Sequence, residues 1–387
     1  MFFQNTEASC NQSRQLFTNE TDVSHFWMMK IPPAVVLLCL LACETGGEKR
    51  TSLGAFSEKA LPEISPTQIL EAQWEMPCSI RSIEVLDDST VFFAGSDGWM
   101  GQTRDAGIHW ETFQWTAPDG SHPSFRATGF NGHHWFAASI ESPGYIIRHS
   151  PSFGQASIVH TDERPEVFWD AMAWWNDAEG LVFGDPVGGC MTLLTTRDSG
   201  LTWHQTPCDQ LPAPMPGEAG FAASNGNIAL SGDSTWVFTG GMTSRCLFSA
   251  DRGRSWSIQA LPILQGAVMT GVFSAHFVNH FEGKAMGGNW DKPEVNEGNL
   301  IETKDGGQHW TLLAEGSGPG YRSSLVHHPK RPQELVAVGF LGVDVSRDAG
   351  HTWTHASDSS HFVARFSPSG RTLWLAGNKH IARLPWP

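Results

Sequence analysis

An eight-residue pattern, Ser/Thr-x-Asp-x-Gly-x-x-Trp, occurs five times in this chain and constrains its fold more than any other feature. In every copy the hydroxyl, the carboxylate, the glycine and the indole keep the same spacing. The copies span residues 103–110, 196–203, 249–256, 303–310 and 346–353. A pattern that returns along the chain indicates that the protein is built from repeated supersecondary units.

The chemistry of the pattern predicts a tight turn between two strands. Short hydroxyl and carboxylate side chains bond to nearby backbone groups in Asx and ST turns. Glycine adopts the left-handed backbone conformation without steric cost, and tryptophan buries its indole beneath the turn. The five aspartates are therefore expected to be structural residues of turns at the outer edge of the fold, not catalysts: Asp105, Asp198, Asp251, Asp305 and Asp348.

The spacing of the copies predicts the blades of a β-propeller. Successive aspartates lie 93, 53, 54 and 43 positions apart, and the wide first interval contains a degraded copy at residues 150–154. Repeats of about 40–50 residues match four-stranded propeller blades. The predicted blades cover residues 80–115, 125–161, 168–207, 220–262, 271–314 and 321–356.

The two ends of the repeat region predict a seventh blade. Residues 361–366, 372–377 and 380–386 have the composition of three strands, and residues 69–76 can supply the fourth. Closing a ring in this way hides both sheet edges. The expected fold is therefore all-β: one seven-bladed β-propeller over residues 67–387, closed by an N-terminal strand that completes the last blade.

Residues 29–43 resemble a lipoprotein signal peptide. Met29 and Lys30 precede an apolar run that is too short to span a bilayer but suits a signal peptide. The run ends Leu-Leu-Ala-Cys43, which resembles a bacterial lipobox, so Cys43 is the expected lipidation site. Residues 1–28 are then a mis-assigned upstream start and residues 44–66 a flexible tether. The alternatives are an uncleaved signal peptide or a chance apolar run.

The expected location is outside the cytoplasm, in the periplasm or on the outer membrane, with membrane contact through the lipid only. Export permits disulfides. Cys190 and Cys208 each lie nine residues from Ser199, the middle of one repeat turn, so they would face each other across a hairpin. A disulfide and two buried thiols are both compatible with that spacing.

Composition excludes some partners and cofactors. A net charge of −15 argues against nucleic acid, whose phosphates would be repelled. Neither a nucleotide-binding glycine motif after a strand nor a Cys/His metal spacing is present in the sequence, so no cofactor and no metal are expected. The adjacent pairs His133-His134 and His327-His328 alternate across a strand and are expected at the surface or in turns. We expect a monomer.

The repeated pattern is the Asp-box, or BNR repeat, of propellers that resemble sialidases and their non-enzymatic relatives. A closer resemblance is carried by motifs at blade starts and strand ends: Ser79-Ile-Arg81, Ser124-Phe-Arg126, Phe168-Trp-Asp170, Phe183-Gly-Asp185, Pro216-Gly-Glu218, Gly271-Val-Phe-Ser274 and Tyr321-Arg322-Ser323. Through these motifs residues 68–387 resemble bacterial relatives of the photosystem II stability/assembly factor. Such relatives are often called oxidoreductases, a name that no cofactor motif in this sequence supports.

Residues at the blade starts form the candidate site, because the first strand of each blade lines the central channel. The expected ligand-binding residues are Arg81, Arg126, Asp170, Asp185, Glu218, Ser274 and Arg322. One interpretation is a closed network of arginine–carboxylate pairs that holds the blades together. The other is a cup that binds an anion or a sugar, since arginine binds carboxylates through paired hydrogen bonds.

Two functions follow, and whether the protein is an enzyme stays open. The preferred one is a lipid-anchored interaction module that binds an envelope protein or helps to assemble an envelope complex. The alternative is a sialidase-like glycoside hydrolase or lyase that acts on acidic glycans, with catalytic candidates Asp170, Glu218 and Tyr321. A true sialidase is disfavoured, because the Phe/Tyr-Arg-Ile-Pro motif of sialidases is absent.

Overall fold

The computed structural model describes residues 72–149 and 155–387, which belong to the second of two compact units, Pro62–Pro387. The predicted upstream segment, signal peptide, lipidation site Cys43 and tether lie outside the described residues, as does the degraded repeat at 150–154. Among the helices of the described part, none combines the length and the apolar character needed to cross a membrane.

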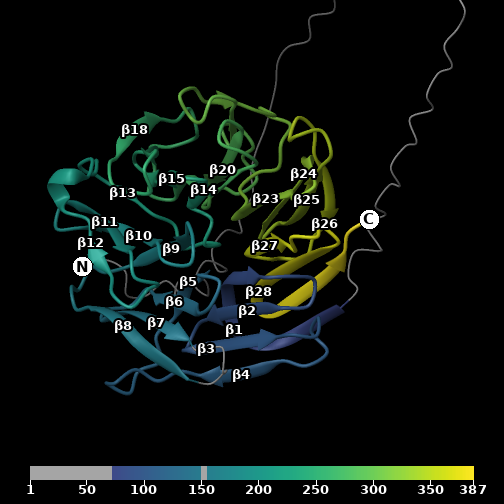
Figure 1. Cartoon of the computed structure of the whole chain (residues 1–387). Helices are drawn as coiled ribbons and strands as arrows, with labels where there is room; N and C mark the ends of the chain where they lie inside the picture. Colours follow the sequence, from purple (N-terminus) through teal and green to yellow (C-terminus); the bar gives the residue numbers. More distant parts are fainter. Residues whose placement is uncertain (1–71, 150–154) are drawn as a thin grey trace, which may run out of the picture. The chain divides into compact units, whose positions relative to one another are not determined.

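The described chain is all-β, as predicted, and its antiparallel strands surround a central axis (Figure 1). The first sheet contains β27 (Val363–Phe366), β28 (Thr372–Pro385), β1 (Ala72–Val85), β2 (Val91–Gly95), β3 (Trp99–Thr103) and β4 (Glu111–Gln114). The second contains β5 (Phe125–Phe130), β6 (Trp135–Ser139), β7 (Gly144–His149) and β8 (Ala156–Asp162). The third contains β9 (Trp169–Trp174), β10 (Gly180–Val187), β11 (Cys190–Thr196) and β12 (His204–Gln205).

Three further sheets complete the ring. The fourth contains β14 (Ile228–Ser231), β15 (Ser234–Phe238), β17 (Arg245–Ser249) and β18 (Ser257–Ala260). The fifth contains β13 (Glu218–Ala219), β16 (Gly240–Gly241), β19 (Thr270–Phe277), β20 (Gly283–Asn289), β21 (Leu300–Thr303) and β22 (Thr311–Leu312). The sixth contains β23 (Ser324–His328), β24 (Arg331–Gly339), β25 (Gly342–Ser346) and β26 (Thr354–Ser357). The innermost strands contact one another in the order β1, β5, β9, β14, β19, β23, β27 and back to β1.

The β-propeller is confirmed, but the prediction of seven blades is wrong, because the strands form six sheets. The predicted last blade does not stand as a separate sheet. Strand β1 is long enough to pair on both sides: Ala72–Glu75 face His380–Arg383 of β28, and Ser82–Val85 face β2. Strands β27 and β28 therefore extend the first sheet to six strands, and the two ends of the described chain pair with each other.

The five repeats form turns with one hydrogen-bonding scheme. The Ser/Thr hydroxyl accepts from the glycine N–H at 2.8–3.0 Å in all five copies, as in Gly253 N to Ser249 Oγ. The Asp carboxylate accepts from the backbone N–H four residues later at 2.9–3.0 Å. The residue before the glycine also has a positive φ, for example 57° at Arg252. A bulky side chain in this conformation is uncommon, so the two side-chain bonds hold the backbone there.

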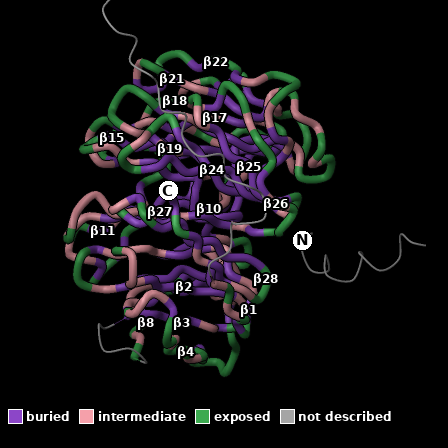
Figure 2. Tube along the Cα trace, turned by 90° about the vertical axis from the view of Figure 1, so that its right-hand side faces the viewer, coloured by how far each residue is buried: buried purple, intermediate pink, exposed green. Residues whose placement is uncertain are grey.

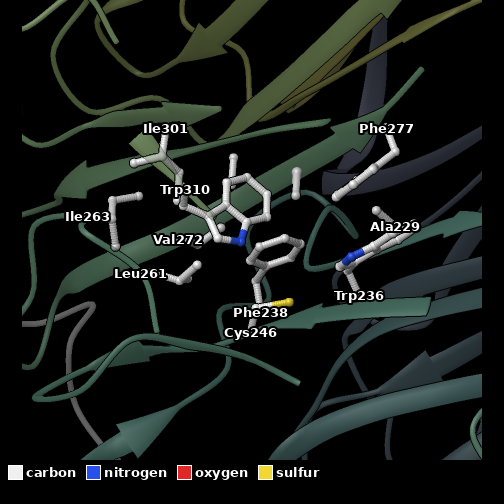
Figure 3. Close-up of a cluster of buried hydrophobic side chains, with 12 residues drawn as sticks. Ala229, Trp236, Phe238, Cys246, Leu261, Ile263, Val272, Phe277, Ile301 and Trp310 are labelled. Atoms are coloured by element: carbon white, nitrogen blue, oxygen red, sulfur yellow. The ribbon is translucent and has the colours of Figure 1, made fainter. Parts of the chain in front are cut away.

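The core lies between neighbouring sheets, where buried strands alternate with exposed turns along the chain (Figure 2). Figure 3 shows one such cluster between the fourth and fifth sheets, with Trp236, Phe238 and Trp310. The ring of Trp236 stacks on Phe277 with centroids 3.7 Å apart, and its indole N–H donates to Gly306 O in the next repeat turn at 2.9 Å. This repeat turn is thus joined to the core of the preceding sheet.

A disulfide joins Cys190, at the start of β11, to Cys208, at the start of the 3-10 helix η2 (Cys208–Gln210). Their Cα atoms are 5.5 Å apart, within the usual range for a disulfide. Of the two possibilities that the sequence left open, the structure has the disulfide. The other cysteines of the described ranges, Cys78 and Cys246, are buried thiols.

Removing one repeat carboxylate tests how much these turns stabilise the ring. Asp251→Ala deletes acceptors for Ser249 Oγ and for the N–H groups of Arg254 and Ser255. We expect the free energy of unfolding to fall by about 1–2 kcal/mol, as for loss of a side-chain cap, in urea titrations followed by tryptophan fluorescence. Asp291→Ala, at an exposed loop position, is the matched control. Equal stability of the two variants would contradict the role given to the turns.

Candidate functional site

One end of the channel, called here the upper face, collects most of the candidate residues. It is formed by the starts of the innermost strands and by the connections from the second to the third strand of each sheet. Arg81 lies beside the register pair Ile80 and Gly95, at the end of β2. Arg126 lies near the start of β5, and Asp170 near the start of β9.

Arg81 and Arg126 are close enough to influence each other electrostatically. The guanidinium of Arg81 lies over the ring of Phe362, 4.1 Å from its centroid. Burial and then the charge of Arg126 lower the pKa of Arg81 to about 10, while Tyr321 acts in the opposite direction. Arg81 therefore stays charged at neutral pH. Two like charges held together favour an anion between them.

Two carboxylates meet beside the arginines, at Gly220. Asp185 accepts from Gly220 N at 2.8 Å, and Asp170 lies so close to Gly220 that a Cβ there would collide with Oδ2. Asp170 is fully buried. Burial and the charge of Asp185 raise its pKa well above the usual value, although the charge of Arg126 and a hydrogen bond from Ala222 N act to lower it. Burial raises the pKa of Asp185 to about 6. Burial and the neighbouring carboxylate thus both favour the protonated form of Asp170.

Glu218 and Arg322 are not members of this group, because each is held in its own ion pair. Glu218 Oε1 accepts hydrogen bonds from Arg245 Nε at 3.0 Å and from Thr239 Oγ1 at 2.7 Å. Arg322 is buried and binds Asp344 through Nε to Oδ2 at 2.7 Å. For these two residues the structure has the closed arginine–carboxylate pairs that the sequence left as one alternative.

Tyr321 and Ser274 are also engaged in packing and hydrogen bonds that hold the fold together. Tyr321 is buried and packs edge-on against Phe273, with centroids 4.7 Å apart; burial raises the pKa of its hydroxyl. Ser274 Oγ accepts from Leu325 N at 3.0 Å and so ties β19 to β23. Neither side chain is placed like a nucleophile in an open cup.

An exposed apolar ridge lies on the same face. It consists of Met215, Met242, Val268, Trp290 and Leu341, each at least 40% exposed. The loops that carry them touch: Gly266 N donates to Gly241 O at 3.3 Å, and Trp290 N donates to Met269 O at 3.0 Å. The ring of Trp290 contacts Phe340, and Phe340 contacts Tyr321, the neighbour of Arg81.

Sequence reasoning missed a second polar group, which links the innermost strands of several sheets. Asn225, with a φ of 56°, accepts from Met172 N at 2.7 Å and donates to Thr128 O at 2.9 Å. Arg365 reaches it from β27 and donates to Ser224 O at 2.9 Å. Arg365 lies on a predicted innermost strand, so the reasoning that selected Arg81 also applies to it. Asn225 had no such signal, because it precedes its strand.

Within residues 72–149 and 155–387 there is no group of three or more His, Cys, Asp or Glu side chains arranged to hold a metal ion. His327 and His328 are buried, 5% and 2% exposed, so the expectation that they lie at the surface is wrong. Their strand, β23, is covered on both sides by neighbouring sheets.

Comparisons with known proteins support the fold. No protein-family model matches the chain, and no curated protein matches it. Among solved structures, "YCF48 bound to D1 peptide" is similar with a TM-score of 0.59 and 16% identity, covering 82% of this chain and 97% of that one. YCF48 from Cyanidioschyzon merolae has a TM-score of 0.59 and 12% identity, covering 81% and 99%. The structure of U3-55K has a TM-score of 0.58 and 13% identity, covering 82% and 98%. YCF48 is a photosystem II assembly factor, and all three likenesses show a β-propeller.

Substituting Asp185 tests the carboxylate pair. Because its pKa is raised, the folded state holds a proton more tightly than the unfolded chain, so wild-type stability falls as pH rises from about 4 through about 6. Asp185→Asn keeps the acceptor for Gly220 N and removes that charge. We expect the variant to be more stable than wild type by about 1–3 kcal/mol at pH 8. The difference should vanish near pH 4, and a pH-independent difference would contradict the pair.

Breaking the Glu218–Arg245 pair tests its structural role. Glu218→Ala leaves Arg245, whose side chain is 15% exposed, without its carboxylate, and loss of one partner of a buried pair costs about 3–5 kcal/mol. We expect a loss of that size in chemical unfolding. Adding Arg245→Met should restore part of it, because no unpaired charge then remains. A stable single variant would show that the pair is not structural.

Proposed function

We propose that this protein is an interaction module of the cell envelope, exported and anchored through a lipid on Cys43, whose upper face binds an extended segment of a partner protein. The proposal combines the lipobox-like sequence at 40–43 with the chemistry of the upper face. The repeat turns are attributed to the Asp-box class on the basis of their sequence pattern.

The observation that carries the proposal is the adjacency of two arginines and the exposed apolar ridge. Surfaces that bind protein segments combine exposed aromatic and methionine side chains with a few fixed polar groups. Trp290 and Met242 supply the first kind, and Arg81 and Arg126 supply the second. A matching segment carries apolar residues beside a carboxylate. The structural neighbour whose title reads "YCF48 bound to D1 peptide" supports peptide binding by this fold, at fold level only.

The hydrolase alternative receives less support from the same residues. Both Asp170 oxygens are buried away from solvent, Glu218 is engaged by Arg245, and Tyr321 is packed among aromatic rings. A glycosidase needs two carboxyl groups that both reach the substrate, about 5–10 Å apart. The proposed role is therefore binding.

Peptide binding by the full-length protein tests the proposal. Fluorescence anisotropy would compare a labelled peptide of alternating leucine and glutamate with the same peptide carrying glutamine. We expect the acidic peptide to bind at least about tenfold more tightly, from charge-assisted bonds to arginine. Arg81→Gln combined with Arg126→Gln should remove this preference, and Trp290→Ala should weaken the binding of both peptides.

Ile108→Ala, at an exposed position in a repeat turn, is the control and should bind both peptides as wild type does. Circular dichroism confirms that each variant is folded. Failure of both peptides to bind, or an acidic preference that survives loss of both arginines, would reject the upper face as the binding surface.

A further inference from the structure

The opposite end of the channel contains a cavity that the proposed function does not use. Its volume is about 610 Å³, within the range of about 300–1,000 Å³ for small-molecule sites. It is formed by the ends of the innermost strands β14, β19, β23 and β27 and by the turns that follow them. Asn225 and Arg365 both line the cavity and are joined by a hydrogen bond.

Arg365 supplies the positive charge of the cavity. Its Nη1 donates to Ala364 O at 2.8 Å and its Nη2 to Ser224 O at 2.9 Å. Nη2 also donates to Asn225 O at 3.4 Å. A guanidinium has five N–H donors, and within the described ranges no hydrogen bond from its Nε–H is found. Donors therefore remain for a ligand, held in place by the bonds that fix the rest of the group.

Glu84 neutralises Arg365 only in part. Burial raises the pKa of Glu84 to about 7, in spite of the charge of Arg365 and a hydrogen bond from Thr128. At neutral pH this carboxyl is therefore protonated in a large fraction of molecules. Up to one positive charge is left for a ligand to balance, which suits a monoanion better than a dianion.

Two imidazoles form the polar wall beside Arg365. The rings of His276 and His327 meet edge-on, with centroids 4.8 Å apart. Burial, followed by the charge of Arg365, lowers the pKa of His276 to about 4, and burial also lowers the pKa of His327 well below its usual value. Both are neutral at physiological pH, and a neutral imidazole offers one N–H donor.

The imidazole of His327 is 5% exposed, and its Nδ1 is buried without a hydrogen-bond partner among the described residues. An unsatisfied buried polar atom costs free energy. A half-turn of the ring exchanges Nδ1 with Cδ2 and turns the nitrogen to the other side. A ligand in the cavity that offers an acceptor would satisfy it.

We propose that this cavity binds a small organic carboxylate. The carboxylate faces Arg365 and the imidazoles of His276 and His327. The apolar body lies against the other walls of the cavity, which include Ile228, Phe277, Val326 and Phe366. An arginine beside neutral donors in a partly apolar cavity fixes one anionic group of a ligand. The rest of the ligand is then selected by how well its shape fits the apolar walls.

Calorimetric titration of the full-length protein tests this inference. The probes are naphthalene-2-carboxylate and naphthalene-2-carboxamide, which have the same shape and differ in charge. We expect saturable binding of the carboxylate, at least about tenfold tighter than the amide, from charge-assisted hydrogen bonds. His327→Phe, which keeps a ring and removes the donor, should weaken carboxylate binding by about tenfold and leave the amide unchanged.

Leu230→Trp, at the edge of the cavity, should block both probes. His204→Phe, on β12 outside the cavity, is the matched control and should bind as wild type does. Arg81→Gln should also bind as wild type does, which separates this site from the upper face. Absence of binding, equal binding of the two probes, or full carboxylate binding by His327→Phe would overturn the proposal.

Discussion

The structure depends on the double pairing of β1. One half of this strand binds β28 at the end of the chain, and the other half binds β2, so the ring is closed by hydrogen bonds between residues about 300 positions apart in the sequence. A ring without this closure would leave two strand edges with unpaired backbone groups. The cores between the sheets, and both ends of the channel, require the closed ring.

The buried charges fall into two groups, which differ in whether each charge is balanced by one opposite partner. Glu218 of β13 pairs with Arg245 of β17, and Arg322 pairs with Asp344 of β25, so each of these charges has an opposite partner. Arg81, Arg126, Asp170 and Asp185 meet between sheets, where like charges adjoin and pKa values move away from their usual range. The first group is structural. The second group lies at the upper face, beside the surface proposed to bind a partner segment.

The two ends of the channel differ in chemistry. At the upper face, two arginines adjoin an exposed apolar ridge, which suits the proposed extended peptide. At the opposite end, one arginine and two neutral histidines line a cavity of small-molecule size. Asn225, held in a left-handed backbone conformation by its own side-chain bonds, connects β5 and β9 and contacts Arg365 of β27.

The sequence by itself determined the repeat architecture. Spacing and turn chemistry are local properties, so the five repeat turns, the strands around them and the contact of the two chain ends could be predicted from the residues. The positions of Arg81, Arg126, Asp170 and Asp185 at one end of the channel could also be predicted, because each begins or ends a strand of known direction. Only the tertiary structure decided the sheet count, since it depends on whether β1 stays continuous between two partners. It alone decided the partners of Glu218 and Arg322, and the contacts of Asn225 with β5, β9 and Arg365. These depend on distances between residues far apart in the chain, which local spacing does not specify.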